Sequence, residues 1–239
     1  SHAVEVLLLV EVTELGHVAE VYAMPLAPLR PKEDYRLVRI DTESAPLRFS
    51  QLACASFTRG TRLSLATGEQ RAVETLKIGD NLLTRDDGPQ TVRWIGHHTV
   101  RAIGDFAPVL IRKGTLHNEN DLLVSPDHRL FVYQREDRLG AGRAEVLLKA
   151  RDLVNGESVS RQEGGFVDYF QILFDAHQIV FAEGIAAETL LMEPRTRSAL
   201  PAHIAEALSG TPSGHKSRAQ GEFEVGASLL SRPDAAELL

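Results

Sequence analysis

The chain has little of several residue types, and each scarcity excludes a class of protein. It has one cysteine, Cys54, among 239 residues, so it forms neither an intramolecular disulfide nor a zinc site built from several cysteines. Acidic residues outnumber basic ones, and the net charge of −7 argues against a nucleic-acid partner, because proteins that bind nucleic acids are normally basic. The longest strongly apolar run, Val6 to Val10, is much shorter than the roughly 18 residues that span a membrane. The hydrophobic content of 43% is nevertheless ordinary for a folded globular protein.

Common catalytic and cofactor motifs are also missing. There is no glycine-rich loop followed by lysine and serine or threonine, and no Gly-x-Ser-x-Gly sequence around a nucleophilic serine. The segment Gly140 to Gly142 is too short to be a dinucleotide-binding fingerprint. The nine histidines invite a metal site, but His97 and His98 are neighbours on a predicted strand and therefore face opposite sides. We expect no cofactor, no metal, no membrane partner and no nucleic-acid partner.

Short strands dominate the expected secondary structure. Apolar residues at every second position from Val4 to Val12 predict a half-buried strand, and His17–Met24 and Tyr35–Asp41 are predicted as two more. After residue 50, β-type runs recur about every ten residues between turn signals such as Gly79-Asp80-Asn81. These runs are Arg62–Ala66, Asn81–Thr84, Thr91–Ile95, Val109–Arg112, Leu122–Ser125, Arg129–Tyr133, Tyr169–Phe174 and Gln178–Ala182. Their regular spacing indicates an all-β fold.

The chain divides into three predicted regions. Residues 1–50 form an upstream β segment, residues 51–193 form the main β domain, and residues 194–239 form a helical C-terminal tail. Within that tail, residues 195–208 carry apolar side chains at helical spacing, and residues 233–239 are expected to be a short helix.

A series of short sequence blocks is the most informative feature of the main domain. The blocks are SFTRGT (56–61), VETLKIGD (73–80), LTRDDG (83–88), VRWIG (92–96), SPDHRL (125–130), KARDLVNG (149–156) and HQIVFAEGI (177–185). Their order and spacing resemble the Hedgehog/intein (Hint) family, in the form of bacterial Hint domains that are not inteins. The resemblance covers residues 56–191. It implies an all-β, horseshoe-like fold with two pseudo-twofold halves.

The resemblance also implies a reaction at the protein's own backbone. In Hint proteins, the residue that opens the first block attacks the carbonyl of the preceding residue and converts the amide into an ester or thioester. Here that residue is Ser56, and the bond is Ala55–Ser56. The family more often has cysteine there, and a serine hydroxyl is a weaker nucleophile that needs a neighbouring base. Ser56 is alternatively a polar residue at the start of a strand.

Four further residues are candidates for the same site by resemblance. His128 is expected to activate the amide nitrogen of the scissile bond as a leaving group, and Ser125 to orient that amide by a hydrogen bond. Asp175 and His177 belong to a late block that approaches the same centre, where either serves as a base or an orienting group. The alternative for His128 and His177 is that each stabilises a turn. Cys54 is either a displaced nucleophile or a small buried hydrophobic residue, and we favour the second.

Complete protein splicing is not expected. Inteins end in a His-Asn pair whose asparagine cyclises, whereas residues 186–189 here are Ala-Ala-Glu-Thr. The expected function is therefore autoprocessing, an N–O acyl shift and a single self-cleavage whose substrate is the chain's own upstream segment. The alternative is a non-cleaving Hint scaffold that binds or tethers a partner, and a hydrolase for an external peptide or ester ranks third.

Overall fold

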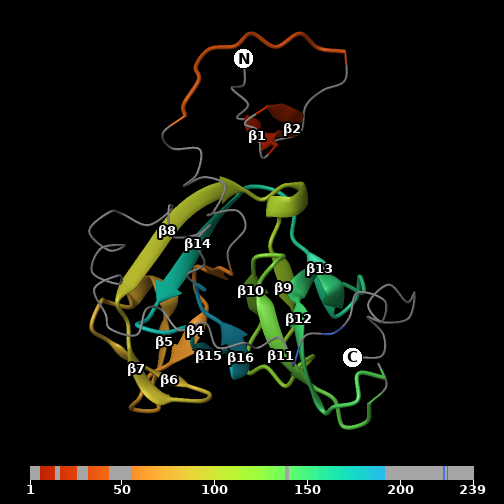
Figure 1. The fold of residues 1–239 in the computed structure, drawn as a ribbon. Coiled ribbons are helices and arrows are strands. Elements are labelled where there is room, and N and C mark those ends of the chain that lie inside the picture. The colour runs from red at the N-terminus through yellow and green to blue at the C-terminus, as the bar shows by residue number, and fades with distance from the viewer. Residues whose placement is uncertain are drawn as a thin grey trace.

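The computed structural model is all-β (Figure 1). The residues that it describes are 6–13, 17–25, 32–42, 55–137, 140–191, 223 and 225. They form a two-stranded, a six-stranded and an eight-stranded sheet, with all strand pairs antiparallel, and three short 3-10 helices. The predicted helices over 195–208 and 233–239 lie outside the described residues.

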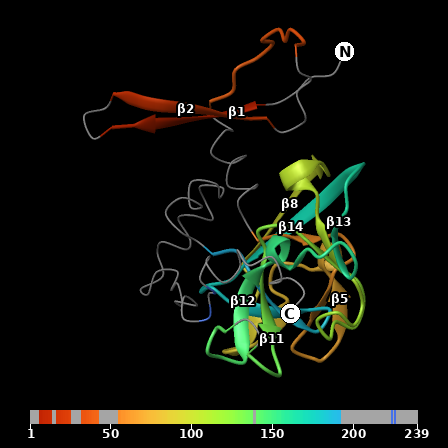
Figure 2. The ribbon, with the colours of Figure 1, turned by 90° about the vertical axis from the view of Figure 1, so that its right-hand side faces the viewer.

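The upstream segment forms a hairpin. Strands β1 (Val6–Val12) and β2 (Val18–Pro25) pair only with each other and lie side by side in Figure 2. Residues Tyr35–Asp41, predicted as a third strand, are not a strand in the structure. An extended segment becomes a strand only when a partner takes up its backbone hydrogen bonds, and no described strand lies beside this one. Its apolar side chains are exposed, Val38 to 81%.

The six-stranded sheet contains the start of the main domain as one of its inner strands. Its order is β13-β9-β10-β3-β14-β8. The bounds are β3 (Phe57–Thr58), β8 (Trp94–Arg101), β9 (Val109–Ile111), β10 (Leu122–Val124), β13 (Val159–Arg161) and β14 (Phe166–Leu173). Because β3 lies between β10 and β14, the residue that precedes it, Ser56, is placed beside the end of β10 and an inner residue of β14.

The second sheet packs on the same core. Its order is β12-β11-β16-β15-β4-β5, with β6 paired to β15 and β7. The bounds are β4 (Arg62–Ser64), β5 (Gln70–Ala72), β6 (Asn81–Thr84), β7 (Gly88–Thr91), β11 (Arg129–Tyr133), β12 (Glu145–Lys149), β15 (Ile179–Ala182) and β16 (Ile185–Glu188). The 3-10 helices are η1 (Val73–Thr75), η2 (Gly104–Phe106) and η3 (Ala150–Leu153). One apolar cluster includes Phe57 and Ile172 from the first sheet and Leu63 and Leu148 from the second.

The strand prediction is confirmed for most of the main domain. Asn81–Thr84 and Arg129–Tyr133 match β6 and β11 residue for residue. Strands β3, β5, β12, β13 and β16 are absent from the predicted runs. β16 contains two alanines, which have low β propensity, and it becomes a strand by pairing with β15 across a two-residue turn. Both turn residues, Glu183 and Gly184, have positive φ angles of 49° and 87°, as such a turn requires.

Candidate functional site

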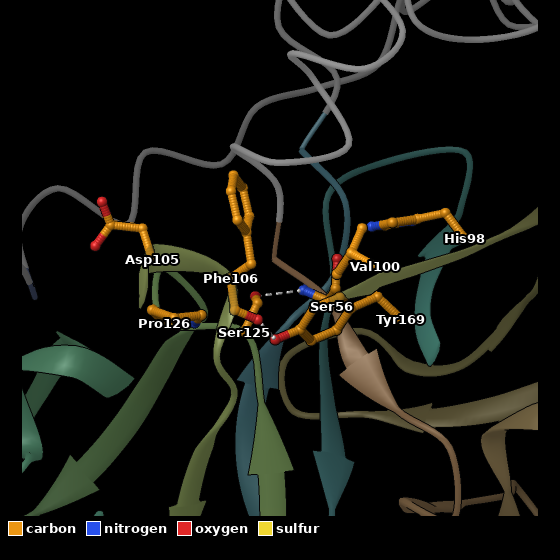
Figure 3. A pocket seen from close by; sticks show the side chains of 8 residues that line it. All are labelled: Ser56, His98, Val100, Asp105, Phe106, Ser125, Pro126 and Tyr169. Atoms are coloured by element: carbon orange, nitrogen blue, oxygen red, sulfur yellow. Dashed lines mark hydrogen bonds between the residues drawn. The ribbon is translucent and has the colours of Figure 1, made fainter. Parts of the chain in front are cut away.

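The site begins where strands β3 and β10 meet. Their register pairs Phe57 with Val124, so antiparallel geometry places Ser56, just before β3, opposite Ser125, just after β10. The Ser56 N–H donates to Ser125 Oγ at 3.1 Å, and the Ser125 N–H donates to the Ser56 carbonyl oxygen at 3.0 Å (Figure 3). Both residues are buried. Ser125 therefore binds the amide nitrogen of the Ala55–Ser56 bond and the carbonyl that follows it.

His128 contacts the carbonyl of Ser56 as well, from the far end of a tight turn that starts at Ser125. The His128 N–H donates to the Ser125 carbonyl at 3.0 Å and closes a turn between β10 and β11. The side chain, however, contacts two carbonyls far away in sequence. Nδ1 lies 3.0 Å from the Ser56 carbonyl oxygen, and Nε2 lies 2.9 Å from the Glu188 carbonyl oxygen. The edge of the ring also packs against Phe57, so the imidazole is held on three sides.

Burial decides the charge of this imidazole. The ring is fully buried, and the loss of hydration lowers the pKa of His128 to about 4. Its two carbonyl contacts favour the charged form and oppose this shift, whereas the nearby Arg129 charge adds to it. A neutral imidazole has one N–H for two carbonyl oxygens, whereas an imidazolium donates to both. His128 is therefore neutral at pH 7, and its contacts improve when it accepts a proton.

The Ser56 hydroxyl has a partner that the sequence analysis missed. Gln171 Nε2 donates to Ser56 Oγ at 3.3 Å. The pairing of Phe170 in β14 with Phe57 in β3 brings the next residue, Gln171, beside Ser56. In the sequence, Gln171 could have been noticed as the one amide side chain inside the apolar run from Tyr169 to Phe174. A buried polar residue in an otherwise apolar strand indicates a specific partner.

A second buried charged group lies directly behind His128. Glu188 ends strand β16, and besides accepting from His128 through its carbonyl, it accepts from Arg129 Nε through Oε2 at 2.6 Å. His177 Nε2 lies 3.8 Å from Glu188 Oε1, and both side chains are almost fully buried. Glu188 thus joins His177, Arg129 and His128 into one buried cluster, which the sequence analysis did not include.

The structure does not bring Asp175 into this cluster. Its two carboxylate oxygens accept from Arg93 at 2.7 to 3.0 Å in an ion pair that is about half exposed. Of the five candidate residues, Ser56, Ser125 and His128 form direct contacts, and His177 reaches them through Glu188. Cys54 lies outside the described residues.

A small hollow opens beside Ser56. It is lined by Ser56, His98, Val100, Asp105, Phe106, Ser125, Pro126 and Tyr169 (Figure 3). The Tyr169 hydroxyl donates to the Phe106 carbonyl at 3.0 Å, and burial raises the pKa of Tyr169 above its usual value. His98 is nearly buried on this side, while His97 is exposed and stacks on Phe170, so the two rings face opposite sides of β8 as predicted.

The described part of the chain has neither a metal-binding cluster of side chains nor a membrane-spanning helix. None of its histidine, cysteine, aspartate or glutamate side chains gather in groups of three or more that could hold a metal ion. No helix within these residues has the length and hydrophobicity of a membrane-spanning segment.

The fold and the site together define an all-β domain in which buried polar side chains contact the N–H of the Ala55–Ser56 peptide bond and the carbonyl of Ser56. The family model of the Hint domain matches residues 55–194, more than half of the chain, and the chain belongs to this family. The Hint resemblance and the all-β fold predicted from the sequence blocks are therefore confirmed.

Several solved structures are similar to this chain. The bacterial intein-like domain from Clostridium thermocellum is 16% identical, with 56% of this chain and 97% of that chain covered and a TM-score of 0.38. A DnaB intein from Synechocystis sp. PCC 6803 is 10% identical, with 57% and 99% covered and a TM-score of 0.37. The TvoVMA intein is 13% identical, with 56% and 96% covered and a TM-score of 0.38. No curated protein matches the chain.

Proposed function

We propose that this Hint domain cleaves itself once, at Ala55–Ser56, by an N–O acyl shift without splicing. One observation carries the proposal: Ser125 and His128 bind the peptide groups on the two sides of Ser56, in a buried position. Buried groups that hold a reacting bond in one geometry lower the entropy cost of reaction. The substrate is the chain's own upstream segment, and each molecule turns over once.

Each of these side chains has a role in the proposed acyl shift. Ser56 Oγ attacks the Ala55 carbonyl carbon, the carbon–nitrogen bond breaks, and the hydroxyl proton replaces it on the Ser56 nitrogen. His128 is the proposed carrier of this proton: it lies at the Ser56 carbonyl, next to the scissile amide, and gains a second donated hydrogen bond when protonated. Gln171 donates to Ser56 Oγ and so holds the attacking oxygen in one position.

The ester formed by this shift ends in hydrolysis or transfer to another nucleophile. Asparagine cyclisation is unavailable, because the family's terminal His-Asn pair is replaced by Ala-Ala-Glu-Thr at residues 186–189. The downstream chain then leaves with Ser56 as its first residue.

Intact-mass measurement of the purified chain tests the proposal. We expect fragments that end at Ala55 and begin at Ser56, and hydroxylamine should accelerate their appearance because it attacks esters. Ser56→Ala should abolish both effects, and His128→Ala should slow cleavage at least about 100-fold. Ser160→Ala, in which another hydroxyl is removed from β13, is the matched control and should cleave like the wild type. Unchanged cleavage in Ser56→Ala would overturn the proposal.

The alternative function is a non-cleaving scaffold that binds or tethers a partner. It is favoured by two contacts: His128 Nδ1 faces the carbonyl of Ser56 rather than its amide nitrogen, and that nitrogen donates to Ser125 instead. Ser56→Cys separates the two functions, because a thiol is the stronger nucleophile in the same position. An autoprocessing domain should cleave faster with this substitution in the presence of dithiothreitol. A scaffold should remain a single mass species.

A further inference from the structure

We propose that the hollow beside Ser56 binds the water molecule that hydrolyses the ester, with His98 as its general base. This inference rests on the proposed function and deepens it, because it assigns the second half of the reaction to residues that the acyl shift does not use. The hollow has Ser56, whose hydroxyl would carry the ester, and the imidazole of His98 on the walls of one space (Figure 3).

Strand register explains why these side chains share one face of the sheet. Tyr169 in β14 pairs with Thr58 in β3 on one side and with His98 in β8 on the other. Directly paired residues of antiparallel strands project their side chains from the same face, and residues two apart on one strand do so as well. Ser56 precedes Thr58 by two residues, so its hydroxyl lies on the face that carries His98.

The size of the hollow matches that of a water molecule. The volume open to the centre of a water-sized sphere is about 10 Å³. A buried water needs roughly 10–15 Å³ by this measure, together with polar partners. The hollow therefore fits about one water, and the hydroxyl groups of Ser56 and Ser125 and the His98 ring supply polar groups on its walls.

Among the lining groups, His98 is the one suited to accept a proton from this water. The Tyr169 hydroxyl is committed to the Phe106 carbonyl. The Asp105 side chain is 96% exposed at the rim and faces Arg161 at 3.7 Å. His98 is nearly buried, its ring packs against the Tyr169 ring with centroids 5.7 Å apart, and imidazole is the side chain that ordinarily exchanges protons near neutral pH.

Hydrolysis of the ester then transfers one proton through His98. Water attacks the Ala55 carbonyl carbon of the ester and gives one proton to His98. The bond from that carbon to Ser56 Oγ breaks, and Oγ takes up the proton from His98. The products are a carboxylic acid at Ala55 and a chain that starts with Ser56, whose hydroxyl and amine are both free. No oxidant, metal or further reactant takes part.

The experiment compares two neighbouring histidines in the full chain. Cleavage of the wild type, His98→Ala and His97→Ala is followed by intact mass in buffer alone and in buffer with hydroxylamine. His97 is the matched control because it lies on the opposite face of the same strand. We expect His98→Ala to lose at least about 100-fold in buffer, a typical contribution of a general base. Hydroxylamine, which needs no base, should restore its cleavage to the wild-type rate.

The outcomes separate this inference from the proposed function. If the wild type does not cleave in either buffer, the proposed function fails and the inference fails with it. If the wild type cleaves and His98→Ala hydrolyses at the same rate, only the inference is overturned. Added imidazole should speed hydrolysis in His98→Ala and leave His97→Ala unchanged, which a purely structural role of His98 does not explain.

A second variant protects the test against misfolding of His98→Ala. Val100→Phe leaves His98 in place and adds volume to the hollow, so it should slow hydrolysis by displacing the water. Its thermal unfolding is measured in parallel. Hydrolysis at the wild-type rate in folded Val100→Phe would overturn the hollow as the water site.

Discussion

At the scale of single residues, Ser125 makes two hydrogen bonds to Ser56, one through its side chain and one through its backbone. It accepts from the Ser56 N–H and donates its own N–H to the Ser56 carbonyl, and both groups are buried. The first of these bonds depends on the side chain. A buried N–H without an acceptor costs more than the hydrogen bond is worth, because the group has also lost its hydration.

Removal of the Ser125 hydroxyl should therefore destabilise the fold as well as slow cleavage. We expect Ser125→Ala to lower the free energy of unfolding by about 1–3 kcal/mol, measured by urea denaturation. Ser125→Thr keeps the acceptor oxygen and should recover most of this loss. An alanine variant with wild-type stability would show that Ser125 Oγ is not the acceptor that satisfies the Ser56 amide.

At the scale of elements, the hairpin of β15 and β16 positions the buried carboxylate behind the site. The turn at Glu183 and Gly184 sets the register, which pairs Ile179 with Glu188. Strand β16 also pairs with β11, with Ala187 opposite Leu130, so Glu188 meets Arg129 at the start of β11. This ion pair is nearly buried on the glutamate side, unlike the half-exposed pair of Arg93 and Asp175.

These two ion pairs should differ strongly in their contribution to stability. Glu188→Gln removes the carboxylate that accepts from the partly exposed Arg129 and should cost about 1.5–3 kcal/mol, the range for a hydrogen bond to a charged group. Asp175→Asn removes the equivalent charge from the surface pair and should cost less than about 1 kcal/mol. Denaturant unfolding of both variants measures the difference. Equal losses would contradict the assignment of Glu188 as a structural anchor of the site.

At the scale of the whole molecule, the buried His128 links the stability of the fold to pH. Its pKa is about 4 in the folded protein and near 6.5 when unfolded, so the unfolded chain binds more protons between these values. The free energy of unfolding therefore falls as the pH is lowered from about 6.5 to about 4. Asp168 loses its contribution only at lower pH, since hydrogen bonds from Thr99 and Arg59 hold its pKa at about 2.

The expected loss over this range is about 3 kcal/mol, from the free energy of a pKa shift of this size. Urea denaturation at several pH values measures it. His128→Gln should remove this part of the pH dependence, whereas His97→Gln, with an exposed ring, should retain it. A slope that is the same in His128→Gln and in the wild type would contradict the buried, neutral state of His128.

Much of the fold, and part of the site, could be predicted without the structure. Alternating and regularly spaced apolar runs indicate strands because a strand's side chains alternate between two faces. The prediction failed for Tyr35–Asp41, where the pattern is present and no described strand pairs with it. It also missed β16, which is a strand because of its partner β15. The apolar pattern is a property of a single segment, whereas strand formation also requires a second segment that takes up its backbone hydrogen bonds.

The amino-acid sequence alone identifies the family, because the order and spacing of the blocks are properties of the linear chain. It also names Ser56, Ser125 and His128 as candidates. Only the tertiary structure decides which atoms meet: Ser56 and Ser125 are 69 residues apart, and strand register brings them within 3.1 Å. The pairing of β3 with β14 adds Gln171 to the site. Long-range packing places Asp175 in an ion pair with Arg93 instead. Hydrogen bonds act over about 3 Å, a distance that only the folded backbone sets.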